Sequence, residues 1–151
     1  MSGIARGVYP VVLKAAGAQT ASTVGPTIII PDGYARARFV VSCTARSGTT
    51  PTLAVFIQTG TVFPAAGDLV GNRTTGTLTW NDLVSFASIT NTGVQYASFI
   101  ETSGFINAAQ DAALTAGSIR AGVIGSYIRY KSTITATTPS FTYSVFAEFL
   151  P

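Results

Sequence analysis

Apolar and polar residues alternate along several segments of the chain, and the clearest case is residues 35–45. Phe39 and Val41 fall on one side of this segment, whereas Arg36 and Arg38 fall on the other. A period of two is the pattern of a β-strand that buries one of its faces. We therefore expect a strand here, with Phe39 and Val41 pointing into the core.

The same alternation returns in several other segments, each bounded by residues that favour turns. Two of the junctions are Thr-Thr-Pro sequences, at residues 49–51 and 137–139. A proline that opens a returning strand is tolerated where no ladder hydrogen bond is needed. We therefore expect two similar hairpins, each forming an equivalent corner of a two-sheet sandwich. The further alternating segments are residues 53–58, 77–89, 94–100, 127–134 and 141–149.

The remaining segments define the domain organisation. Residues 105–115 are the candidate helix, because apolar residues recur there near helical spacing. Residues 1–25 are weakly patterned and form either an N-terminal arm or an edge strand, and residues 26–151 form a single β-sandwich domain. The expected fold is all-β: an antiparallel β-sandwich, jelly-roll-like, with at most one short helix.

Composition supports this fold and argues against enzymatic function. Only 10% of the 151 residues are charged, against about 25% in an average domain, and Thr, Ser and Gly fill the difference. The chain has no histidine, and Cys43 is its one cysteine, so His-based relays, His-containing zinc sites and intrachain disulfides are excluded. No phosphate-binding loop or nucleophile motif is found.

We therefore expect no enzyme: no catalytic residue, no cofactor and no metal site. One enzymatic alternative stays open, a carbohydrate-active enzyme that uses two of the six carboxylates. The formal charge of +3 comes from scattered Lys and Arg residues, so a nucleic-acid partner is not expected. No apolar run approaches the roughly 18 to 20 residues of a spanning helix, so no membrane partner is expected either. The first residues lack a signal-peptide pattern, which favours synthesis in a cytoplasm.

Several apolar and basic residues fall on the outward side of their strands. The phenylalanines among them indicate either strands covered on both faces or a patch that binds a partner. The basic residues form two pairs, which make one basic stripe if their strands are neighbours and otherwise belong to a solvated outer face. Because charges are few, we expect the chain to associate. The candidate interface residues are Phe56, Phe99, Phe146, Arg36, Arg38, Arg129 and Lys131.

Two stretches resemble segments of small structural proteins of tailed bacteriophages. The first is FVVSCTARSGTTPTLAV, residues 39–55, and the second is YIRY, residues 127–130, followed by TPSFTYSV, residues 138–145. The resemblance implies a compact β-sandwich, often jelly-roll-like, that coats or cements a virion shell. It implies no catalytic residues.

Together these features predict a non-enzymatic virion structural protein, made in the host cytoplasm and located on the capsid exterior. Its expected role is a capsid decoration or cement protein that docks on the assembled phage head and stabilises it. The expected partners are the major capsid protein or another virion protein, and copies of itself in a trimer that suits three-fold joints of the shell. The alternative is a tail-fibre or other virion-associated module that binds a receptor or carbohydrate, with Tyr9, Tyr34, Trp80 and Tyr96 as candidate contacts.

Overall fold

The computed structural model describes residues 7–30, 33–63, 77–100, 113–120 and 125–151, with the side chains of 63, 77 and 98–100 left out. This part of the chain contains strands and no helix, so the expected all-β fold is confirmed. The helix expected over residues 105–115 falls almost entirely outside the described residues. The strands are β1 (Tyr9–Gln19), β2 (Thr23–Val24), β3 (Ile28–Ile29), β4 (Arg36–Phe63), β5 (Thr77–Ser85), β6 (Gly93–Ile100), β7 (Ser118–Ile119) and β8 (Tyr127–Leu150).

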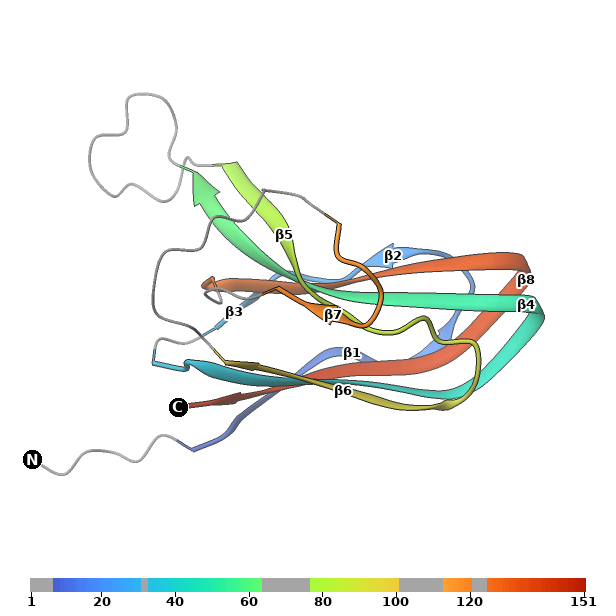
Figure 1. The fold of residues 1–151 in the computed structure, drawn as a ribbon, viewed down its shortest axis with the longest axis horizontal. Coiled ribbons are helices and arrows are strands. Elements are labelled where there is room, and N and C mark those ends of the chain that lie inside the picture. Colours follow the sequence, from blue (N-terminus) through green and yellow to red (C-terminus); the bar gives the residue numbers. More distant parts are fainter. Residues whose placement is uncertain (1–6, 31–32, 64–76, 101–112, 121–124) are drawn as a thin grey trace, which may run out of the picture.

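These strands form one antiparallel sheet that is folded double into a sandwich (Figure 1). β4 and β8 pair along most of their length, from Arg36 opposite Leu150 to Gly60 opposite Tyr127, with register shifts near the bends. Both strands turn back at the right-hand end of Figure 1, so each contributes one half to each layer. Layer 1 has the order β1, β8, β4, β6. Layer 2 has β2 and β3 beside β8, followed by β4, β5 and β7.

The Thr-Thr-Pro sequences do not form hairpins, and that expectation is wrong. Residues 35–45 and 53–58 belong to the two halves of β4, and both halves pair with β8 instead of with each other. The same holds for residues 127–134 and 141–149 in β8. The physical reason is that alternation identifies the two faces of a strand and says nothing of the strand beside it.

The two Thr-Thr-Pro bends are equivalent, and they meet in one shared corner. Thr50 has φ 47° and Thr138 has φ 48°, so both bends use the left-handed conformation just before proline. Gly48, at φ 111°, lies against the bend of β8: a Cβ there would be 3.0 Å from the Thr138 carbonyl oxygen and 3.1 Å from Pro139 Cα. Glycine therefore permits the close approach of the two bends.

The core lies between the layers and is supplied mainly by β4 and β8. As predicted, Phe39 and Val41 are fully buried. The Tyr143 hydroxyl of layer 1 donates a hydrogen bond of 2.9 Å to Ser132 Oγ of layer 2, and both residues are buried. Burial raises the pKa of Tyr143 to about 12. The other fully buried core residues of these two strands are Leu53, Val55, Ile57, Ile128, Phe141, Val145, Ala147 and Phe149.

Candidate functional site

The described residues hold little that points to catalysis. Asp82 lies opposite Gln58 in layer 2, whereas Glu148 lies opposite Arg38 in layer 1, so these two carboxylates belong to different layers. The described part contains no cluster of three or more potential metal ligands. Cys43 is buried in the core, and desolvation raises the pKa of its thiol. The other carboxylates, Asp32, Asp68, Glu101 and Asp111, lie outside the described residues.

A search of the same residues finds no helix with the length and apolar character needed to cross a membrane. The features that remain are the two outer faces of the sandwich. We call them the layer-1 face and the layer-2 face, after the layer that presents each.

Four apolar side chains cross the layer-1 face in a line, one from each strand. The register places Val12 opposite Phe146, Phe146 opposite Val40, and Val40 opposite Tyr96. Residues directly opposite each other in antiparallel strands share one face of the sheet. Val12 and Tyr96, at the two ends, are each 66% exposed, whereas Val40 is only 2% exposed between its two larger neighbours. We call these residues the apolar row.

Charged residues flank the apolar row on one side. Arg38 and Glu148 lie directly opposite each other and form a salt bridge of 2.5 Å. Arg36, one outward position further along β4, donates from Nε and Nη2 to the Pro151 carbonyl oxygen at 3.1 and 2.6 Å. These interactions join neighbouring strands at the surface, and they leave Val12 and Tyr96 of the apolar row exposed.

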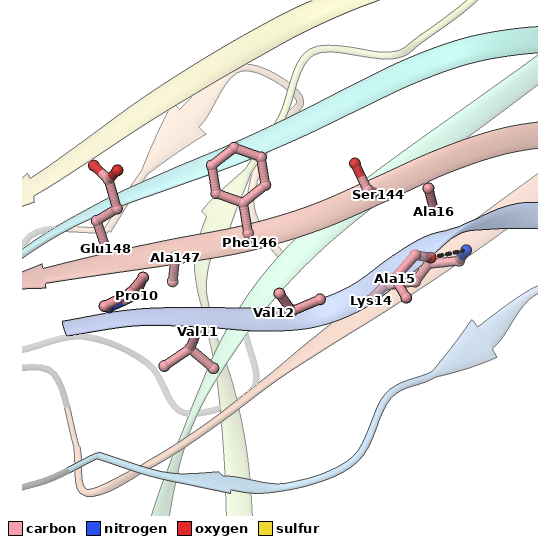
Figure 2. Close-up of a pocket in the computed structure, with 10 residues that line it drawn as sticks. All are labelled: Pro10, Val11, Val12, Lys14, Ala15, Ala16, Ser144, Phe146, Ala147 and Glu148. Carbon is pink, nitrogen blue, oxygen red and sulfur yellow. Dashed lines mark hydrogen bonds between the residues drawn. The ribbon is translucent and has the colours of Figure 1, made fainter.

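Small residues flank the apolar row on the other side. Ser144 lies opposite Ser42, and Ser42 lies opposite Val94, which is 50% exposed. A shallow pocket of about 570 Å³ runs between β1 and β8, where Phe146, Ser144 and Glu148 stand on the same side of β8 (Figure 2). The pocket is lined by Pro10, Val11, Val12, Lys14, Ala15, Ala16, Ser144, Phe146, Ala147 and Glu148.

Irregular pairing of β1 shapes this pocket. The register of β1 on β8 shifts between Val12 and Lys14 and again between Lys14 and Gly17. Lys14 Nζ donates to the carbonyl oxygens of Ala15, Gly17 and Tyr143 at 3.2, 3.1 and 3.0 Å. Partial burial lowers the pKa of Lys14. The ammonium group thus ties the irregular part of β1 to itself and to β8 through three carbonyl groups.

On the layer-2 face, by contrast, polar side chains bind one another. Arg129 Nε donates to Gln58 Oε1 at 2.8 Å, and Gln58 Nε2 donates to Asp82 Oδ1 at 2.8 Å. The Arg129 guanidinium also lies 4.1 Å from the centroid of the Trp80 ring. Gly60 makes room beside this ring, because a Cβ there would lie 3.1 Å from it. We call Arg129, Gln58 and Asp82 the polar chain.

The residues predicted as an interface are divided between the two faces. Arg36 and Arg38 lie in the layer-1 half of β4, and Arg129 and Lys131 lie in the layer-2 half of β8, so the two pairs do not make one stripe. Lys131 Nζ lies 5.8 Å from the ring centroid of Phe56. Phe146 belongs to the layer-1 face and Phe56 to the layer-2 face. Phe99 of β6 lies opposite Ala37 of β4, which is a buried core position and not an outward one, and the side chain of Phe99 is not described.

The sequence pattern did not mark Val12 or Val94 as interface residues. Val12 lies in the weakly patterned first segment, and both valines are placed on the layer-1 face only by pairing with distant strands. Tyr96 was considered only as a carbohydrate contact. Comparison with known protein families, curated proteins and solved structures finds no match to this chain.

Proposed function

We propose that this protein is a non-enzymatic virion structural protein, a capsid decoration or cement protein that docks on the assembled phage head and stabilises it. The observation that carries the proposal is the exposure of Val12 and Tyr96, at the two ends of the apolar row, which marks the layer-1 face as an interface with a virion protein or with another copy of the chain. Exposed apolar side chains that adjoin one another mark interaction surfaces. Burial of such surface contributes about 25 cal/mol per Å². The phage head is proposed as the partner because residues 39–55, 127–130 and 138–145 resemble segments of small structural proteins of tailed bacteriophages.

The layer-2 face differs from the layer-1 face in its polar side chains, and this difference supports the choice of the layer-1 face as the interface. Its arginine and carboxylate, Arg129 and Asp82, are engaged through Gln58, so this face already satisfies its largest polar groups. In the proposal, the protein is made in the host cytoplasm, lies on the capsid exterior, and binds the major capsid protein or another virion protein. It also associates with copies of itself, for which the three-fold joints of a shell favour a trimer.

Such a protein acts by adding buried interface. A protein that binds the assembled shell and not its separated subunits stabilises the shell by mass action. Each contact must bury more than about 1,000 Å² if it is to persist. No bond is made or broken in this role, so it requires no catalytic residue and no cofactor.

The test compares phage particles with and without the protein. We expect many copies per particle, release of the packaged DNA at a lower temperature after the protein is stripped away, and recovery when purified protein is added back. Particles treated identically and given an unrelated β-sandwich protein are the control. Equal heat and osmotic resistance with and without the protein, together with a handful of copies per particle, would overturn the cement proposal.

One observation favours the alternative, a tail-fibre or other receptor-binding module that recognises carbohydrate. On the layer-2 face, Trp80 lies beside Arg129, and Arg129 binds the amide of Gln58. Aromatic rings beside polar side chains are typical of ligand sites, and a sugar that stacks on this face of Trp80 would displace the Arg129 guanidinium from the ring. A glycan array with the wild type and a Trp80→Ala variant tests this alternative. Glycan binding that disappears in Trp80→Ala would favour it, and absence of binding would dismiss it.

A further inference from the structure

The layer-1 face is complementary to itself. Its strands follow the order β1, β8, β4, β6. A two-fold axis in the plane of this face, parallel to the strands and between β8 and β4, therefore places β1 of one copy over β6 of the other. The same rotation places β8 over β4 and returns every cross-strand row onto itself.

In the apolar row this rotation matches large side chains with small ones. Tyr96 of one copy meets Val12 of the other, beside the pocket between β1 and β8. Phe146 of one copy lies over the Val40 position of the other, where Val40 is itself only 2% exposed between Phe146 and Tyr96. A two-fold axis perpendicular to the strands would instead place Tyr96 over Tyr96 and Phe146 over Phe146. Matching large with small residues is what allows two sheets to interdigitate.

The flanking rows match in the same rotation. Arg38 of each copy meets Glu148 of the other, because these residues lie opposite each other in one copy. Two salt bridges then become a square of alternating charges. An arginine has five donors, and a carboxylate has two acceptor oxygens, so each group can serve two partners. On the other side, Ser42 meets Ser144.

We propose that two copies of this chain associate face to face through their layer-1 faces about this axis. The inference rests on one part of the proposed function, that the layer-1 face is an interface, and it names a second copy as the occupant. Four strands about 4.8 Å apart, over about eight residues of about 3.3 Å each, span roughly 500 Å². The pair therefore buries roughly 1,000 Å², the size at which an interface becomes stable.

This pairing replaces the expected trimer as the arrangement for the layer-1 face. The face matches itself about a two-fold axis, and an isologous contact of that kind closes with two copies. Surfaces outside this face, such as the exposed Ile29 of layer 2, stay available for the shell. In a virion the dimer is then the unit that docks.

The first experiment measures mass in solution by sedimentation velocity and light scattering. We expect the wild type to have twice the chain mass of 15.6 kDa. Val12→Lys should raise the dissociation constant at least 100-fold, because the ammonium group would be buried under Tyr96 without a partner. Val24→Lys is the matched control, since Val24 is an exposed valine of an edge strand in the other layer. It should leave the dimer intact.

The second experiment exchanges the charges of Arg38 and Glu148. Arg38→Glu or Glu148→Arg alone should weaken the dimer at least tenfold, because like charges then meet within each copy and between copies. The double variant R38E/E148R restores every opposite-charge contact, so it should recover most of the affinity. Circular dichroism of each variant separates lost association from lost folding.

Each outcome bears on the dimer independently of the cement proposal. A wild type that is monomeric at concentrations on the order of 100 µM, or that forms a trimer, would overturn the inference. A dimer unaffected by Val12→Lys would do the same. If a monomer still stabilises phage particles, the cement proposal stands and the dimer falls. If a dimer forms and particles gain nothing from it, the dimer stands and the cement proposal falls.

Discussion

The two outer faces of this sandwich are built on the same two central strands, yet they differ in the contacts that their large side chains make. On the layer-2 face, the Arg129 guanidinium covers the Trp80 ring and is held in place by Gln58. On the layer-1 face, Val12 and Tyr96 are exposed at the ends of the apolar row. Both faces also have exposed apolar residues near their edges, such as Ile29 of layer 2, so the contrast lies in how the polar side chains between them are paired.

The difference comes from the outward residues of β4 and β8. In layer 2 they include Gln58 and Arg129, whose long side chains reach across the strands to polar and aromatic neighbours. In layer 1 they include the Arg38–Glu148 pair, Phe146 and the short Ser42 and Ser144, and these leave Val12 and Tyr96 exposed at the edges. A face with exposed apolar side chains at its edges is suited to receive another protein surface. Substitutions in each face, and in the bend that joins the two layers, test this contrast.

Gly48→Ala should lower the free energy of unfolding the most, because Gly48 lies in the shared corner where β4 and β8 pass from one layer to the other. The new Cβ would meet the backbone of the opposing bend at 3.0 to 3.2 Å, and φ is 111°. We expect a loss of about 3 kcal/mol or more in the free energy of unfolding. Ala136→Gly, at the corresponding position of β8, is the control and should cost under about 1 kcal/mol. Urea denaturation measures the free energy of unfolding of both variants. Similar losses in the two would show that the bends of β4 and β8 are not closely packed at Gly48.

Alkaline pH should lower the free energy of unfolding, because it ionises Tyr143, whose hydroxyl links layer 1 to Ser132 of layer 2. Burial raises the pKa of Tyr143 to about 12 from an ordinary value of 10, so folding favours the neutral phenol. The stabilisation is complete below about pH 10 and is lost between about pH 10 and 12, amounting to roughly 2 to 3 kcal/mol.

Tyr143→Phe tests the assignment of this pH dependence. The variant should remove most of the decline between pH 10 and 12, while losing about 1 kcal/mol at neutral pH because Ser132 is left without its donor. Urea denaturation at a series of pH values measures the free energy of unfolding. A decline as steep in Tyr143→Phe as in the wild type would contradict the role given to this residue.

In residues 35–45 the sequence predicted which residues face inward, because that property depends on position within one strand. Phe39 and Val41 were placed correctly in this way. In residues 94–100 the assignment was reversed, since Tyr96 is 66% exposed and Ala97 is buried. The partners of the strands could not be predicted, since one bend at Thr50 looks the same in sequence whether the chain forms a hairpin or folds a paired sheet double. The prediction of two hairpins failed for this reason.

The candidate surfaces show the same limit. Phe146 was recognised as outward-facing from its own strand. The apolar row also requires the register of β8 with β1 and of β4 with β6, and strand register over such distances has no local signal. Likewise, the two basic pairs look alike in sequence, and only the fold places Arg38 and Arg129 in different layers.

Replacement of Gln58, the middle residue of the polar chain, tests whether the polar chain stabilises the folded protein. Gln58→Leu would remove the side-chain donor to Asp82 Oδ1 and the acceptor of Arg129 Nε, and it would leave the buried Asp82 carboxylate with the Leu114 backbone N–H as donor to Oδ2. We expect a loss of about 2 kcal/mol in the free energy of unfolding. Gln95→Leu is the control, because Gln95 makes one surface hydrogen bond, to the Ala87 carbonyl. It should cost about 0.5 kcal/mol, and equal losses would show that the polar chain adds nothing.

The smallest effects come from a matched pair of arginines, one on each face. Arg129→Met should cost about 1 kcal/mol and shift the fluorescence of Trp80, the one tryptophan, because the guanidinium leaves its ring. Arg38→Met should cost only about 0.2 to 0.5 kcal/mol, since its salt bridge is solvent-exposed. Self-association should show the reverse order, weakened by Arg38→Met and unchanged by Arg129→Met. If both variants affect folding and association alike, the two faces do not differ in the way their side chains indicate.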